Sequence, residues 1–378
     1  MKVKNIIVCS ILALTLYSSV NAESISPSMR NDALKQDTEK LTTLLSGKVV
    51  PVNSESEISP AMKLIEAIQR RDRESIDMIL DSLGKFNVDE QDELGYTALM
   101  WAIKISGMKS VSRRLAYYSD LTVKDLKGRN ALMWALKERR DETADEIIDI
   151  LLWHEDYKEF NVQDEEGKTA LMYAVTEHNT GIVGRLFDIK DEEGNYVVIL
   201  NPLELDKYPR NGEHPMIDSV CTDGGQMLKM FINARDKQGN FRLDLNYTDG
   251  FGYTALSKAS RCSLKDVKII LEAKDDEGNY RMTNLNSSRF EENPLMQATV
   301  TKHMDISSFL LEVKDDEGNY RIDSYTPLDR DVKYRISENK TVEFTKGDMA
   351  FDIAIKIHEE QIAAYLFLIS QIRKQDFR

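Results

Sequence analysis

The residues that could bind a metal or act as nucleophiles are few in this chain and scattered along it. The five histidines are His154, His178, His214, His303 and His358, and no two of them stand at the spacing of a zinc site. The sequence contains neither a Gly-x-Ser-x-Gly turn nor a glycine-rich phosphate loop. We therefore expect a protein that is not an enzyme and that binds no cofactor or metal.

One acidic motif resembles the start of a calcium-binding loop. Asp275, Glu277 and Asn279 alternate as the first ligands of such a loop do. Tyr280 and Arg281 follow at once, and the glutamate that closes a calcium loop is missing. We interpret this motif as a turn.

A nine-residue pattern organises the chain instead. It begins with glycine, continues with a small polar residue and Ala-Leu, and occurs at residues 95–103, 128–136, 167–175 and 252–260. A pattern that returns after roughly 20–50 residues is typical of stacked repeats. Catalytic motifs being absent, the function should depend on the surface that these repeats form.

Each repeat is predicted to be a turn followed by two antiparallel helices. Gly167 suits the last position of a tight turn, where φ is positive, and Thr169 can cap the following helix. A second short turn is expected at Asn179 and Thr180. Apolar residues at helical spacing then mark two stripes: Leu171, Ala174 and Val175, followed by Ile182, Val183, Leu186 and Phe187. One unit is too small to bury both stripes, so neighbouring units must stack.

These residues resemble the ankyrin repeat, whose pattern is D-x-x-G-x-T-P-L-H-x-A followed by V-x-x-L-L. Asp92, Gly95, Thr97, Leu99 and Ala102 occupy the matching positions, as do Asp164, Gly167, Thr169, Leu171 and Ala174. Alanine replaces the usual proline, and Met100, Met133 and Met172 replace the histidine. The resemblance implies an all-α solenoid of ankyrin repeats. It also places Trp101, Trp134 and Tyr173 where a buried leucine is usual, so we expect them in the core.

The C-terminal half carries insertions that predict β-hairpins. An acidic turn ending in Gly-Asn and an aromatic residue occurs at residues 190–196, 235–241, 274–280 and 314–320. Because these turns recur at a nearly constant offset, we expect them to stack as a ridge. A further hairpin is expected within residues 324–345, with its turn at residues 337–340.

Three segments are predicted along the chain. Residues 1–22 have the charged start, short apolar run and Val-Asn-Ala site of a cleaved signal peptide, which predicts a periplasmic or secreted bacterial protein without membrane insertion after cleavage. Residues 23–58 form a polar leader segment and linker. Residues 59–378 form the solenoid of about eight units, of which the first and last are degenerate caps.

Composition restricts the kind of partner. The net charge is −14, which argues against nucleic acid and anionic membranes because their phosphates would be repelled. The charge permits a basic protein partner. We expect a non-enzymatic exported scaffold that binds a protein. An inhibitor or immunity-type protein that covers a basic exported enzyme is one alternative, and an enzyme or enzyme subunit with its site in the hairpin-bearing half is another.

The resemblance implies that partners contact the turn tips and the exposed end of each first helix, along the concave face. Carried over position by position, it nominates Glu93, Leu94, Tyr96, Lys104, Leu126, Lys127, Arg129, Lys137, Glu138, Glu165, Glu166, Lys168, Thr176, Glu177, Phe251, Tyr253 and Arg261. Among them Tyr96, Arg129, Phe251, Tyr253 and Arg261 are the strongest candidates, because exposed aromatic residues and arginines carry much of the energy at interfaces.

Two cysteines remain after removal of the signal peptide. Cys221 and Cys262 would lie near the ends of first helices in adjacent repeats, and an exported protein meets conditions in which disulfides persist. Packed helices are about 8–10 Å apart, whereas a disulfide needs Cα atoms within about 7 Å. The bond is therefore possible only where the helices approach closely, and the sequence leaves it open.

Overall fold

The computed structural model describes residues 58–376, except residues 106, 139–144, 146, 151–158, 207, 208, 210, 211, 288, 338 and 339. Ser59–Arg378 forms one compact unit, which is described here. The predicted signal peptide and linker lie outside the described residues, so both stay predictions. No helix in the described part of the chain is long and apolar enough to span a bilayer.

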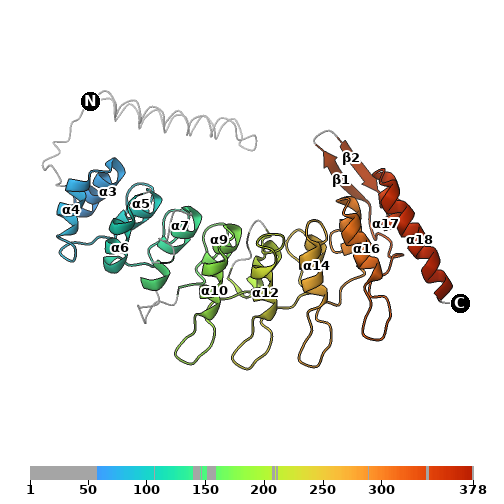
Figure 1. Ribbon diagram of the computed structural model, residues 1–378. Coiled ribbons are helices and arrows are strands. Elements are labelled where there is room, and N and C mark those ends of the chain that lie inside the picture. Colours follow the sequence, from blue (N-terminus) through green and yellow to red (C-terminus); the bar gives the residue numbers. More distant parts are fainter. Residues whose placement is uncertain are drawn as a thin grey trace, which may run out of the picture. The chain divides into compact units, whose positions relative to one another are not determined.

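The helices of this unit follow one another as antiparallel pairs (Figure 1). The first helices of successive repeats are α3 (Pro60–Arg70), α5 (Ala98–Lys104), α7 (Ala131–Glu138), α9 (Ala170–Thr176), α11 (Pro215–Asp218), α13 (Ala255–Ala259), α15 (Pro294–Val300) and α17 (Ala350–Lys356). The described second helices are α4 (Arg73–Leu80), α6 (Lys109–Tyr118), α10 (Thr180–Asp188), α12 (Gln226–Asn233), α14 (Leu264–Leu271), α16 (Met304–Glu312) and α18 (Glu360–Asp376). A 3-10 turn, η1, covers Pro202–Glu204.

Local sequence fixes where these helices begin. Thr97, Thr169 and Thr254 precede first helices, and each side chain accepts a bond from a backbone N–H three residues on. Asn179 caps α10 in the same way, at the predicted second turn. The glycine before each threonine has the positive φ that the turn requires, for example 77° at Gly95 and 84° at Gly167.

The core runs through the whole series of repeats. Each first helix packs against the first helix of the next repeat, from α3 to α17. The leucine of the recurring Ala-Leu pair lies between them: Leu99, Leu132, Leu171 and Leu256 are at most 1% exposed. Stacking thus supplies the buried surface that one unit lacks.

The four Gly-Asn insertions form shorter hairpins than predicted. Each is closed by one isolated bridge, Lys190–Tyr196, Arg235–Phe241, Lys274–Tyr280 and Lys314–Tyr320, and has no extended strands. Hydrogen bonds to an aspartate in the turn hold the loop together, in place of a ladder of backbone bonds between strands. Asp191 Oδ1 accepts bonds from the backbone N–H groups of Glu193 and Asn195, and its other oxygen accepts from the Asn195 amide.

Side-chain contacts join the second, third and fourth of these hairpins as neighbours. Arg235 pairs with Asp276 of the next hairpin at 2.7 Å. Asp316 of the last hairpin accepts from Tyr280 Oη at 2.9 Å and from Lys274 Nζ at 2.6 Å. Figure 1 shows the loops side by side at one end of the helices. These contacts form the ridge expected from the constant offset.

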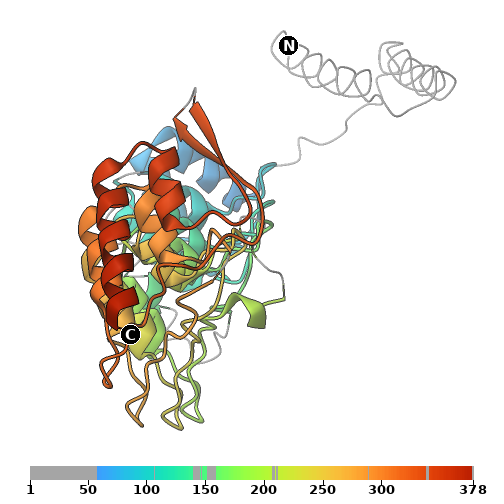
Figure 2. The same cartoon turned by 90° about the vertical axis from the view of Figure 1, so that its right-hand side faces the viewer.

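A longer hairpin precedes the last repeat, inside the predicted insertion. Strands β1 (Val332–Ser337) and β2 (Lys340–Phe344) pair antiparallel, with Tyr334 opposite Val342. Phe344 is fully buried and its ring lies 5.5 Å from that of Phe290, which attaches the hairpin to the preceding repeat. Figure 2 shows it beside the last helices.

Cys221 and Cys262 form a disulfide in the structure, with their Cα atoms 6.1 Å apart. The bond joins the segment after α11 to the segment after α13, and so links two consecutive repeats. Cys221 also donates its backbone N–H to the buried Asp266 at 2.7 Å.

Candidate functional site

The turn aspartates of three repeats bind an aromatic residue nine positions later. Asp92 accepts a bond from Trp101 Nε1 at 2.7 Å, and Asp164 accepts one from the Tyr173 hydroxyl at 2.7 Å. Asp125 accepts the same bond from Trp134 at 3.0 Å. Each aspartate thereby anchors the first turn of its helix to the preceding loop.

These aromatic side chains are less buried than expected from the resemblance. Trp134 is 3% exposed and belongs to the core, as predicted. Trp101 and Tyr173 are half-buried, although they make the same bond to the turn aspartate as Trp134 does. They thus contribute ring surface to the turn side of the repeats.

Arg129 is not a surface residue, which corrects its nomination as a partner contact. It is 4% exposed and donates twice to Oδ2 of Asp125, from Nε at 2.9 Å and from Nη2 at 2.7 Å. Its guanidinium also lies 4.1 Å from the centre of the Trp134 ring. The charge is held inside the turn because Asp125 is buried at the same place.

Hydrogen bonding sets the protonation state of this pair. Burial alone would raise the pKa of Asp125, but the bonds from Arg129 and the charge of that residue outweigh burial and lower the pKa. Asp249, the turn aspartate of a later repeat, has Tyr253 and Lys258 where Asp125 has Arg129 and Trp134. Burial raises the pKa of Asp249, since its backbone bonds only partly offset the loss of water.

Lysine side chains cover the rings of this region. Lys104 Nζ lies 4.9 Å from the ring centre of Tyr96, 4.8 Å from that of Trp101 and 5.4 Å from that of Trp134. Lys137 Nζ lies 5.6 Å from the Trp134 ring. We call Tyr96, Trp101, Trp134, Lys104 and Lys137 the cation–aromatic strip.

A small cavity of about 260 Å³ adjoins the strip and collects several nominated residues. Five of its lining residues were nominated from the sequence: Lys127, Arg129, Lys137, Glu165 and Glu166. Burial lowers the pKa of Lys137, and the positive charges of Arg129 and Lys127 lower it further. The cavity is thus a place where charges of both signs converge.

The other nominated residues have varied surroundings. Glu93, Leu94, Leu126, Thr176 and Phe251 are exposed, and the apolar turn tips Leu94, Leu126 and Phe251 are 53%, 67% and 60% exposed. Lys168 is half-buried and forms an ion pair with Glu213 at 2.7 Å. The tips therefore offer apolar contact area, whereas Lys168 already has a carboxylate partner.

Tyr253 and Arg261 lie apart from the strip and connect two repeats. Arg261 donates to the Tyr253 hydroxyl at 3.2 Å and to Oε1 of the fully buried Gln297 at 2.7 Å. Both nominated side chains are half-buried. Their removal should therefore affect stability as well as any binding, contrary to the independent role expected from the sequence.

The hydrogen bonds that these aromatic side chains donate to the turn aspartates were not predicted from the sequence. The signal was present, since an aromatic residue follows Asp92, Asp125 and Asp164 at the same offset of nine residues. The fourth copy has Lys258 at this offset from Asp249, and Lys258 pairs with Asp218 at 2.7 Å instead. A constant offset between a turn acid and an indole or phenol thus identifies the bond.

Comparison with known proteins identifies the repeats. Residues 64–158 match the family model described as ankyrin repeats, with 3 copies. This segment is similar to ankyrin repeats. Ankyrin repeats commonly mediate protein–protein interaction and are generally non-enzymatic. The later helix pairs continue the same order of turn, first helix and second helix.

Wider comparisons add little about the partner. A solved structure of the ankyrin repeat domain of Bcl-3, described as a unique member of the IkappaB protein family, is 19% identical to this chain. The match covers 68% of this chain and 99% of that one, with a TM-score of 0.43. No curated protein matches. In the described part of the chain, no group of three or more His, Cys, Asp and Glu side chains is placed to hold a metal ion.

Proposed function

We propose that this protein is a non-enzymatic scaffold that binds a partner protein through the cation–aromatic strip and the turn tips next to it. The observation that carries the proposal is the placement of Lys104 over three rings on the turn side of consecutive repeats. Aromatic surface and cations together are typical of interface centres.

The charges of the strip specify how a partner would be held. Among the described residues, neither Lys104 nor Lys137 has a carboxylate within ion-pair distance, whereas Lys168 is paired. The turn aspartates are occupied by the backbone and by the aromatic donors. A carboxylate of the partner would therefore pair with Lys104 or Lys137 while apolar side chains cover Leu94 and Leu126.

Charge and compartment define the partner class further. The net charge of −14 favours a partner that is basic overall, with the carboxylate contact confined to the strip. Export is part of the proposal: the predicted signal peptide and the disulfide between Cys221 and Cys262 both suit an oxidising compartment. Inhibition of a basic exported enzyme would be a special case of this binding.

Photocrosslinking tests the binding surface directly. A photoreactive amino acid at Leu126 should give a discrete covalent adduct with the partner in cells, because this side chain is 67% exposed beside the strip. Met78 is 66% exposed on α4 and provides the matched control position. Lys104→Glu with Lys137→Glu should reduce the Leu126 adduct at least about tenfold. An adduct equally strong at Met78, or unchanged by charge reversal, would refute the proposed surface.

Export makes a separate prediction about the mature N-terminus. Intact-mass measurement of the protein from the envelope or the medium should show a chain that begins at Glu23, since Val20-Asn21-Ala22 is a small-residue cleavage site. A chain that still contains Met1 would disprove cleavage without bearing on the binding surface.

A further inference from the structure

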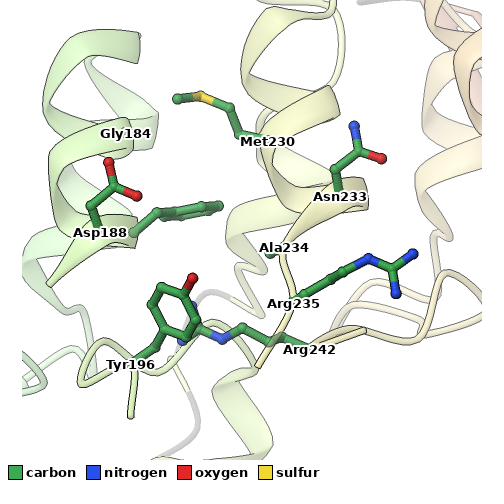
Figure 3. Close-up of a pocket in the computed structure, with 9 residues that line it drawn as sticks. Gly184, Asp188, Tyr196, Met230, Asn233, Ala234, Arg235 and Arg242 are labelled. Carbon is green, nitrogen blue, oxygen red and sulfur yellow. The ribbon is translucent and has the colours of Figure 1, made fainter. Parts of the chain in front are cut away.

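A second cavity lies away from the cation–aromatic strip, between α10 and α12 and the first two Gly-Asn hairpins (Figure 3). Its volume is about 300 Å³, which is at the lower end for small-molecule sites. Gly184, Phe187 and Met230 supply apolar walls, and Tyr196, Arg242 and Asp188 supply polar groups. No part of the proposed protein-binding surface uses these residues.

A glycine opens this cavity. Gly184 stands six residues before Lys190, which is the first bridge residue of its hairpin. The residues at the same offset in the next two repeats are Lys229 and Lys268. Lys268 extends to the next helix, where its Nζ lies 5.1 Å from the ring centre of Phe309. A lysine at 184 would extend across the cavity in the same way, and even a Cβ there would lie 2.7 Å from Met230 Cε.

An arginine in this cavity has fewer partners than its counterparts. Arg281 donates to the carbonyls of Ile232, at the end of α12, and of Leu243. Arg321 donates to the corresponding carbonyls of Leu271, at 2.7 Å, and Met282, at 3.0 Å. Arg242 stands at the same position of its hairpin, but its guanidinium donates only to the Val198 carbonyl among the described residues.

The missing bond leaves guanidinium donors available where the cavity opens. Phe187 stands at the position of its repeat that Ile232 and Leu271 occupy in theirs, three residues before the first bridge residue of the hairpin. Arg242 does not donate to the Phe187 carbonyl, and Phe187 lines the cavity. The Arg242 guanidinium lies 4.9 Å from the centre of the Tyr196 ring, farther than Arg281 lies from the Phe241 ring, at 3.5 Å, and Arg321 from the Tyr280 ring, at 3.8 Å. Figure 3 shows Arg242 extending toward Tyr196. Planar guanidinium donors match the geometry of a carboxylate.

From this geometry we propose that the cavity binds a small carboxylate with an apolar body, held by Arg242 and packed against Gly184, Phe187 and Met230. The carboxylate could belong to a free acid or to a side chain or C-terminus of a polypeptide. An aliphatic chain suits the space that a lysine stem fills in the later repeat.

The other charged groups of the cavity are compatible with this ligand. Arg235 is neutralised by Asp276, and Figure 3 shows its side chain directed away from Met230. Asp188 is exposed at the end of α10, where water screens its charge. Arg242 is thus the cation left to pair with the ligand.

Ligands of equal shape test the proposal. In the full-length protein with ¹³C-methyl methionine, hexanoate should shift the Met230 methyl signal saturably, and it should bind at least about tenfold more tightly than hexanamide because its bonds to arginine are charge-assisted. Hexylamine should bind no better than hexanamide. Tighter binding of hexylamine than of hexanoate would overturn the assignment. A peptide ending in norleucine, with a free or an amidated C-terminus, distinguishes a polypeptide source from a free acid.

Matched variants separate the site from the fold. Arg242→Gln should abolish the hexanoate shift, whereas Arg281→Gln, at the same position one repeat later, should retain it. Gly184→Lys should fill the cavity and prevent binding. Gly181→Lys adds the same charge to α10, where a Cβ has only the Asn179 side chain within 4 Å, and should leave binding intact. Hexanoate binding that survives in both Arg242→Gln and Gly184→Lys would refute the site.

Discussion

Replacing Asp125 with asparagine is expected to lower the free energy of unfolding by about 3 kcal/mol or more. The substitution keeps the shape of the side chain but leaves the guanidinium of Arg129 buried without a counter-charge. It also weakens the bond that the indole of Trp134 donates to the carboxylate. Urea denaturation at pH 7, followed by circular dichroism, measures the loss.

Asp249→Asn is the matched control, since Asp249 is the turn aspartate of a later repeat. The raised pKa of Asp249 means that its charged form is disfavoured in the folded protein, so the neutral amide should leave stability unchanged or increase it. Asparagine can still accept the backbone bonds from Phe251 and Tyr253. Equal losses in both variants would show that the turn geometry, rather than the buried ion pair, is the source of the effect.

Acid is expected to destabilise the protein through His214. This side chain is 1% exposed, its ring packs 4.4 Å from that of Tyr247, and neither ring nitrogen has a hydrogen-bond partner among the described residues. Burial lowers the pKa of His214 from 6.5 to about 3. Because the unfolded chain takes up the proton first, stability should be complete above pH 6.5. It should then fall as the pH approaches 3, by up to about 5 kcal/mol.

His214→Thr tests this dependence against the rest of the titrating groups. Threonine occupies the matching position before α5, α9 and α13, where it caps the helix, whereas His214 makes no side-chain capping bond. The variant should lose less stability than the natural protein between pH 6.5 and 4. Parallel stability curves for the two proteins would show that His214 does not titrate in this range.

The repeat architecture was accessible from the sequence because its signals are local. Gly95, Thr97 and Leu99 each have a role that depends on a few neighbouring residues: a positive φ, a helix cap and an apolar stripe. The hairpin within residues 324–345 followed from alternation in the same way. Such features need only the chain within one repeat.

The partners of polar side chains were decided by the folded arrangement of the turns and repeats. Arg129 follows a turn glycine as Lys168 does, but Arg129 is enclosed with Asp125 of its own turn, whereas the half-buried Lys168 reaches Glu213 of the next repeat. Tyr253 and Arg261 were interpreted as free surface residues, and the structure links them to Gln297 of the next repeat. Glu213 and Gln297 lie in the following repeat, so the repeat that contains Lys168 or Arg261 does not show these contacts by itself.

The sequence by itself therefore determined the ankyrin-type unit, the order of its turns and helices and the places of the insertions, because each depends on residues close along the chain. Only the tertiary structure decided which side chains stay exposed and which form contacts between repeats. Arg242 and Arg281 follow the same motif, yet one donates to one carbonyl beside a cavity and the other to two. The difference arises where two repeats meet, and Gly184 on the preceding helix lines the same cavity as Arg242.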